Sequence, residues 1–230
     1  MLKAGLGLVI VLLSFAGLAQ ETFELKVDGD FTKVDLQGNF EVTLKKGDQQ
    51  RIEVLNTDEN IEDDRILAEL KDDVLTVRIK MDNYRERDID IVITYVNLQD
   101  VTAKYGCVVR IPKPIIADEC KLKVESGGKI KATVQGKKLE AIIATGGSIH
   151  IDGQVEEATY KISAGGTIGA ASMDAKEVIA NVNMGGEIIC KVDEVFKVKV
   201  VSGGTVSYIG DPETFEQKVT LGGTITRIKK

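Results

Sequence analysis

The chain has 230 residues, of which 43% are hydrophobic and only 3 are proline, and this composition excludes a disordered protein. Its formal net charge of −6 argues against nucleic-acid binding, which requires a basic surface. Aromatic residues make up 5% of the chain and tryptophan is absent, which argues against a carbohydrate site built on aromatic platforms.

Residues 1–19 have the pattern of a secretory signal peptide. Lys3 supplies the positive charge, residues 5–15 form the apolar stretch "GLGLVIVLLSF", and Gly17 and Ala19 are the small residues before the cleavage point. The alternative is a transmembrane anchor, but the apolar run is shorter than the roughly 20 residues that a spanning helix needs. We therefore predict cleavage after Ala19, export to the periplasm or cell surface, and no membrane span in the mature chain.

Residues 20–100 are predicted to form an N-terminal part rich in β-strands. Segments such as "FELKV", "VLTVRIK" and "DIDIVITYV" alternate between apolar and polar residues, which is the period of a strand. Residues 59–70, "ENIEDDRILAEL", break this pattern and suggest either a short helix or an acidic loop. We expect this part to run into the first coils of the repeat region and to cover their end, because an uncovered sheet edge is a liability.

Residues 101–230 contain a repeat marked by six pairs of glycines. The pairs recur at an interval of about 19 residues, and the residues on both sides of each pair alternate like strands. One interval is longer by a single residue and the next is shorter by one. A nearly fixed period of this length indicates a solenoid, and strand alternation excludes helical repeats. The pairs begin at Gly127, Gly146, Gly165, Gly185, Gly203 and Gly222.

We therefore predict an all-β fold, a right-handed parallel β-helix with about 19 residues in each coil. Each coil would contain a strand, a Gly-Gly corner, a second strand and a polar turn. Glycine suits such a corner because it accepts a positive φ and leaves room for a close neighbour. A phosphate-binding glycine loop is the alternative, but it requires a helix directly after the glycines, and none is expected here.

The three cysteines are predicted to be unpaired. Cys120 and Cys190 fall on inward positions of different strands, several coils apart, and are too distant for a disulfide. Cys107 takes the place of a corner glycine in the degenerate coil "KYGCVVRIP".

Several segments resemble the exported head GIN domains, a family of auto-transporter adhesins common in Bacteroidetes. The resemblance rests on "FTKVDLQGNFEVTLKKGDQQRIEV" and "DDVLTVRIK", and on the later units "KVESGGKI", "KISAGGTI" and "KVVSGGTV". This chain has Gly-Gly where the family's repeated unit has Gly-x-Gly. The resemblance covers roughly residues 23–225 and implies a β-helical fold and an envelope or surface location. It implies no catalytic residue.

No group of residues predicts a catalytic, cofactor-binding or metal site. His150, the only histidine, should point outward and lacks the partners of a triad or a zinc site. Glu187 stands in an otherwise non-acidic outward column, and Asp152 and Asp193 do not stack with it, so the paired carboxylates of a glycosidase are not expected. An acidic cluster lacks the calcium-loop spacing. It consists of Asp58, Glu59, Glu62, Asp63 and Asp64.

The prediction for function is an exported, non-catalytic adhesin or cell-envelope scaffold that requires no cofactor. Its partner would be an envelope polysaccharide or protein of unknown identity. Two alternatives stay open: a polysaccharide lyase or glycosidase on the same fold, and a periplasmic partner of an envelope regulator. An open end of the β-helix would offer an interface for homo-oligomers, unless Lys229 and Lys230 discourage end-to-end pairing.

Overall fold

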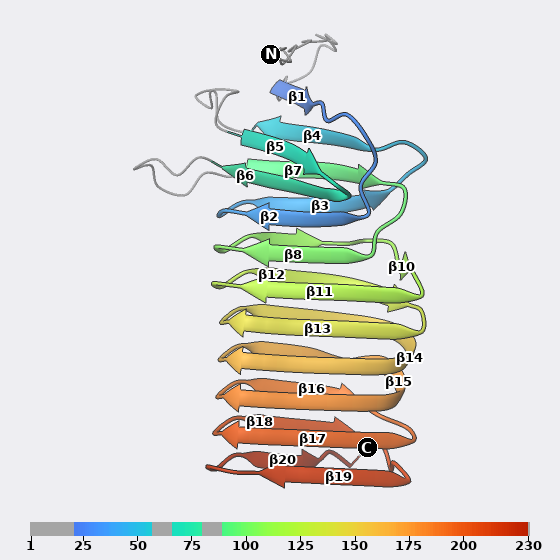
Figure 1. The fold of residues 1–230 in the computed structure, drawn as a ribbon, viewed down its shortest axis with the longest axis vertical. Helices are drawn as coiled ribbons and strands as arrows, with labels where there is room; N and C mark the ends of the chain where they lie inside the picture. The colour runs from blue at the N-terminus through green and yellow to red at the C-terminus, as the bar shows by residue number, and fades with distance from the viewer. Residues whose placement is uncertain (1–20, 57–65, 80–88, 230) are drawn as a thin grey trace.

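The computed structural model describes residues 21–56, 66–79 and 89–229, and these residues form a β-solenoid of about seven turns (Figure 1). Each regular coil of about 19 residues contains two strands that run in opposite directions on two sides of the solenoid. Strands of successive coils pair in parallel, with registers such as Cys120 to Leu139 and Ile130 to Ile149. The all-β solenoid and its coil length are therefore confirmed, whereas the right-handed winding and the requirement for a Gly-Gly corner in each coil stay predictions.

The strands are arranged in two stacks, which we call the front stack and the back stack. The front stack contains β2 (Lys33–Gln37), β8 (Asp100–Lys104), β11 (Glu119–Glu125), β13 (Lys138–Thr145), the second halves of β14 (Ser148–Ala164) and β15 (Thr167–Met184), β17 (Val195–Ser202) and β19 (Thr214–Val219). The back stack contains β3 (Glu41–Lys46), β9 (Val108–Arg110), β12 (Lys129–Gln135), the first halves of β14 and β15, β16 (Glu187–Lys191), β18 (Thr205–Ile209) and β20 (Thr224–Arg227). The short strand β10 (Ile115–Ile116) pairs with the end of β12.

The N-terminal strands extend both stacks, but not in chain order. In the front stack, β2 lies between β8 and β6 (Val74–Ile79), and β5 (Ile66–Lys71) pairs with β6 in an antiparallel hairpin. In the back stack, β3 pairs with β7 (Ile89–Tyr95), followed by antiparallel β4 (Arg51–Asn56) and β1 (Glu21–Leu25).

The hairpin corrects the short-helix alternative for the end of the segment at residues 59–70. Ile66 to Leu70 belong to β5, which pairs with β6, and Asp72 takes a positive φ of 57° in the tight turn between these two strands. The remainder of that segment, with its acidic cluster, lies outside the described residues. The predicted signal peptide also lies outside them.

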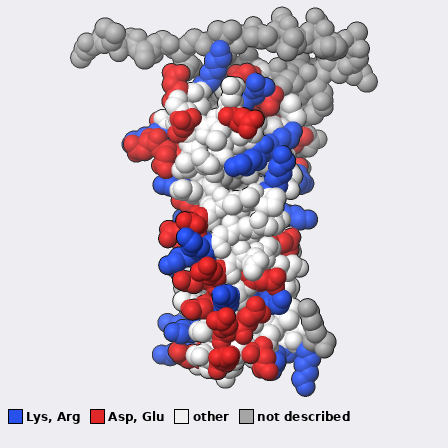
Figure 2. Space-filling model, turned by 90° about the vertical axis from the view of Figure 1, so that its right-hand side faces the viewer, with Lys and Arg blue, Asp and Glu red and all other residues white. Residues whose placement is uncertain are grey.

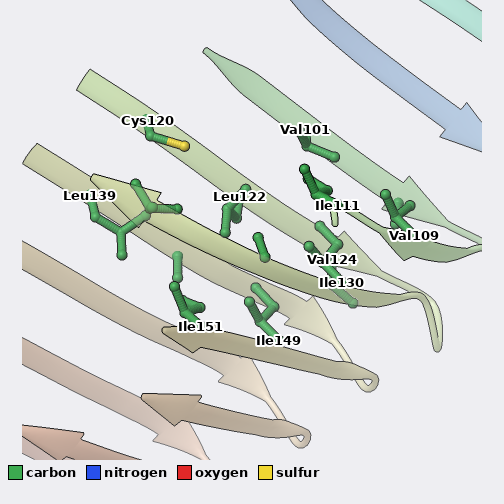
Figure 3. Close-up of a cluster of buried hydrophobic side chains, with 14 of the residues drawn as sticks. Val101, Val109, Ile111, Cys120, Leu122, Val124, Ile130, Leu139, Ile149 and Ile151 are labelled. Carbon is green, nitrogen blue, oxygen red and sulfur yellow. The ribbon is translucent and has the colours of Figure 1, made fainter. Parts of the chain in front are cut away.

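The core lies between the two stacks and consists of the inward residues that the alternation predicted. Figure 3 shows Val101, Leu122 and Val124 of the front stack facing Ile130 and Ile149 of the back stack. In the front-stack column around Tyr160, large and small residues alternate along the stacking direction. Tyr160, which is fully buried, stacks between Ala141 and Ala180, so the small neighbours leave room for its ring.

The irregular spacing of the glycine pairs has a local structural cause. Between β14 and β15 the register shifts after His150, so one extra residue is inserted as in a β-bulge. The next coil recovers this shift, because Thr167 pairs with Glu187 while Glu177 pairs with Val195. The inward and outward columns therefore stay aligned, although one spacing is longer and the next is shorter than the others.

The paired glycines lie between a front strand and a back strand, where the chain reverses (Figure 1). Gly146 and Gly147 have φ values of 58° and 101°, and the amide of Ser148 donates to Gly128 of the previous coil. At the Gly127 pair the positive φ values belong to Ser126 and Gly127 instead. The residue at the place of Gly128 one coil earlier is Cys107, as expected from the sequence.

Candidate functional site

The predicted site residues lie apart from one another. His150 is exposed between buried Ile149 and Ile151, as expected. Its imidazole lies over Gly169 of the next coil, where an added Cβ would be 3.1 Å from Nε2. Sequence reasoning missed this contact, although a glycine at an outward strand position was the available signal. In the described part of the chain, no group of His, Cys, Asp and Glu has the arrangement of a metal site.

The three carboxylates considered for catalysis, Glu187, Asp152 and Asp193, do not stack on one another. Glu187 stacks between Thr167 and Thr205, which confirms the predicted column. Asp152 pairs with Thr133 and Ser172 on β12 and β15, and Asp193 lies in the turn after β16. A glycosidase requires two carboxyl groups about 5–10 Å apart on one face, and these three residues stand in different columns.

The front stack carries ion pairs on its outward side. Glu140 lies between two lysines of the neighbouring coils, 3.0 Å from Lys121 Nζ and 2.7 Å from Lys161 Nζ. The hydrogen bond from Lys161, together with Lys121, holds the pKa of Glu140 below its ordinary value. Lys104 and Asp35 form another pair at 2.9 Å. These charges bind one another within the protein.

The edge opposite the glycine corners is also charged. Figure 2 shows acidic and basic side chains mixed along this edge. Lys137 pairs with Asp118 at 3.2 Å and Lys138 with Glu157 at 3.5 Å, and both pairs connect adjacent coils. Exposed pairs of this kind contribute little to stability, about 0–1 kcal/mol each. Because acidic and basic side chains are mixed along this edge, it carries no patch of a single sign of charge.

The outward side of the back stack differs, because its residues next to the glycine corners are mainly hydroxyl-bearing. We call six of them the hydroxyl strip. They lie in two adjacent outward columns that follow the strand register from β14 to β20, and the other positions of these columns are Glu187, His150, Gly169 and Ile189. All six are half-buried or exposed, and the glycines beside them carry no side chains that would block access. The six residues are Ser148, Thr167, Thr205, Ser207, Thr224 and Thr226.

The three cysteines are free, as predicted, and all three are buried. Burial raises the pKa of Cys120 and of Cys190 to about 12, and it raises the pKa of Cys107 as well. Thiols with raised pKa values stay protonated and unreactive.

We expect no reaction of the folded protein with a maleimide or a disulfide reagent at pH 8, and reaction of all three thiols after unfolding in guanidinium. The measurement is the number of modified thiols by mass spectrometry. A thiol that reacts within seconds in the folded protein would contradict the buried positions.

Comparisons with known proteins agree with this geometry. A family model described as "Putative auto-transporter adhesin, head GIN domain" matches residues 30–212. No curated protein matches the chain. The crystal structure of a putative adhesin from Bacteroides fragilis is similar with a TM-score of 0.84 and 22% identity, over 92% of this chain and 98% of that one.

Two structures from Parabacteroides are also similar in fold. A putative adhesin from Parabacteroides merdae has a TM-score of 0.71 and 23% identity, over 91% of this chain and 96% of that one. A putative lipid binding protein from Parabacteroides distasonis has a TM-score of 0.71 and 20% identity, with the same coverage. Among the described residues, no helix is long and apolar enough to cross a membrane.

Proposed function

The chain belongs to the head GIN domain family, and on that premise we propose that it is an exported, non-catalytic module that binds an extended envelope polysaccharide. The observation that carries the proposal is the hydroxyl strip, which places hydroxyl side chains beside the glycine corners in each coil from β14 to β20 except the coil of β16. The name of the similar protein from Bacteroides fragilis, a putative adhesin, supports a role in attachment.

The chemistry of the strip suits a polymer of sugars. Serine and threonine hydroxyls both donate and accept hydrogen bonds, as sugar hydroxyls do. Successive coils lie about 4.8 Å apart, so an extended chain can meet equivalent groups repeatedly. Several weak contacts on one rigid surface then add up to useful avidity.

The same surface supports binding rather than cleavage. Glu187 is the acidic residue of the strip's first column, and its neighbours in the strand register are Thr167 and Thr205. Neither a second carboxylate for nucleophilic attack nor one for water activation stacks beside it. Substitution Glu187→Gln should therefore change retention of a polysaccharide modestly, and neither this variant nor the wild type should cleave the polymer.

The test is a pair of matched double variants. T167K/T205K places two long charged side chains in the strip. Lys129 already occupies the same column, and Glu187 lies between the two substituted positions as an ionic partner, so the fold should accept both lysines. T102K/T159K makes the same change in charge on the outward side of the front stack. We expect the first variant to lose about tenfold or more of its retention on the polysaccharide, and the second to retain the wild-type value.

Retention is measured by affinity electrophoresis or by pull-down on insoluble polysaccharide, with thermal unfolding as a control for folding. Equal loss in both variants would place the binding elsewhere on the molecule. Unchanged retention in both would contradict the strip as the binding surface.

A further inference from the structure

The last coil leaves one end of the front stack without a covering strand. Every residue of β19 is exposed, and β19 pairs with β17 on one side but with no other front-stack strand in the described part of the chain. Phe215 packs against Phe196 with ring centroids 5.7 Å apart, yet 41% of Phe215 stays exposed. Val219 is 45% exposed. Inward positions that are buried in the earlier coils are therefore open to solvent here.

The free edge of β19 presents backbone groups for pairing. The amides of Thr214 and Thr220 donate to Glu194 and Val200 of the previous coil. Because backbone groups alternate between the two sides of a strand, the amides and carbonyls of Phe215, Gln217 and Val219 point toward the free edge. Natural proteins rarely leave such an edge unprotected, since it is a template for another strand.

The sequence of this edge is chemically symmetric about its central residue. Residues 214–220 read Thr-Phe-Glu-Gln-Lys-Val-Thr. Residues at equal distances in sequence from Gln217 match in kind. The nearest two are an acid and a base, the next two are apolar, and the last two are both threonine. Such a segment is complementary to a second copy of itself that runs in the opposite direction.

We propose that two copies of this chain associate through β19, paired antiparallel about a two-fold axis that passes between their Gln217 residues. Phe215 then lies opposite Val219 of the second copy, and Glu216 opposite Lys218 of the second copy. The residues with free backbone groups fall in the hydrogen-bonded pairs, and each such pair exchanges two backbone bonds. The charged pair falls in the non-hydrogen-bonded position, where side chains are closest.

This arrangement continues interactions that the solenoid already makes between coils. Glu216 lies 3.8 Å from Lys197 of the previous coil. Lys218 of the second copy would place a lysine on its other side, as Lys121 and Lys161 flank Glu140. The contact is isologous, because the same surface serves in both copies, and it closes at a dimer.

Lys229 does not prevent this pairing. It follows β20, which belongs to the back stack, whereas the self-complementary segment belongs to the front stack. A contact made mainly by one strand is small, so the dimer should form reversibly at micromolar concentrations.

The test uses charge reversal and sedimentation velocity of the purified protein over a range of concentrations. Wild type should form dimers as the concentration rises. Glu216→Lys and Lys218→Glu should each weaken the dimer about tenfold or more, because like charges then face each other. An equimolar mixture of these two variants should dimerise again, since each supplies the charge that the other needs. Lys131→Glu changes the charge equally on the back stack and should leave the dimer unchanged.

A second measurement does not depend on affinity. In Gln217→Cys the two thiols meet at the two-fold axis, where the Cα atoms of a hydrogen-bonded pair lie about 5.5 Å apart, within disulfide range. This variant should form a disulfide dimer under mild oxidation, while Lys131→Cys should not. Any of three results would overturn the proposal. They are a protein that stays monomeric at every concentration, a dimer that is insensitive to both charge reversals, and equal cross-linking of the two cysteine variants. Binding to polysaccharide is measured separately, so its failure would leave this result intact.

Discussion

Gly147→Ala is expected to lower the free energy of unfolding by about 3 kcal/mol or more. Gly147 has a φ of 101°, a conformation that L-residues rarely adopt. An added Cβ would lie 2.3 Å from the carbonyl oxygen of Gly128 and 2.5 Å from Val124 Cγ1. Neither atom can move far, because the first belongs to the neighbouring coil's backbone and the second to the core.

Gly146→Ala is the matched control in the same corner. Gly146 has a φ of 58°, which costs an L-residue about 1–2 kcal/mol. The atom nearest to its added Cβ is 4.0 Å away. Urea unfolding of both variants, followed by circular dichroism, measures the difference. Equal destabilisation would show that φ alone determines the need for glycine and that the close approach between coils does not.

Tyr160→Ala is expected to lower the free energy of unfolding by about 4 kcal/mol. Tyr160 is fully buried, and its neighbours along the stack are Ala141 and Ala180. These short side chains cannot expand into the space that the lost ring leaves, so a cavity remains.

Tyr160→Phe separates the ring from its hydroxyl group. The Tyr160 hydroxyl is buried without a hydrogen-bond partner among the described residues, and burial raises its pKa. Removing an unpaired buried polar group should leave stability unchanged or raise it by about 1 kcal/mol. Thermal unfolding of the two variants measures both effects. A Tyr160→Phe variant as unstable as Tyr160→Ala would mean that the hydroxyl is essential.

Strand alternation and the glycine period were sufficient to predict the regular coils. In this region each strand contacts the strand one period away, so a local pattern determines both the pairing and the inward side. Alternation predicts that the outward column of Glu187 runs from Lys129 to Thr224, and the strand registers confirm it in every coil. Cys120 and Cys190 were correctly placed in the core for the same reason.

The N-terminal strands could not be ordered by this reasoning, because their pairing is non-local. Strand β2 lies between β6 and β8, and no periodic signal in the sequence connects these three segments. The turn at Asp72 requires a positive φ without a glycine to indicate it. Residues 66–70 therefore resembled a helix, whereas pairing with β6 makes them a strand.

The surface features were predictable only in part. Alternation showed that His150 and Glu187 point outward, but not that His150 lies over Gly169. Alternation in residues 214–220 also predicts that Phe215 and Val219 point inward, but it does not reveal their exposure, which arises because no following front strand covers them in the described part of the chain.

The most direct test of the proposed function is an incubation of the purified protein with a panel of envelope and plant polysaccharides. Retention of the protein and newly formed chain ends are scored in the same samples. The account predicts retention on at least one class of polysaccharide with no new chain ends. New chain ends that disappear in Glu187→Gln, or no retention on any member of the panel, would contradict it.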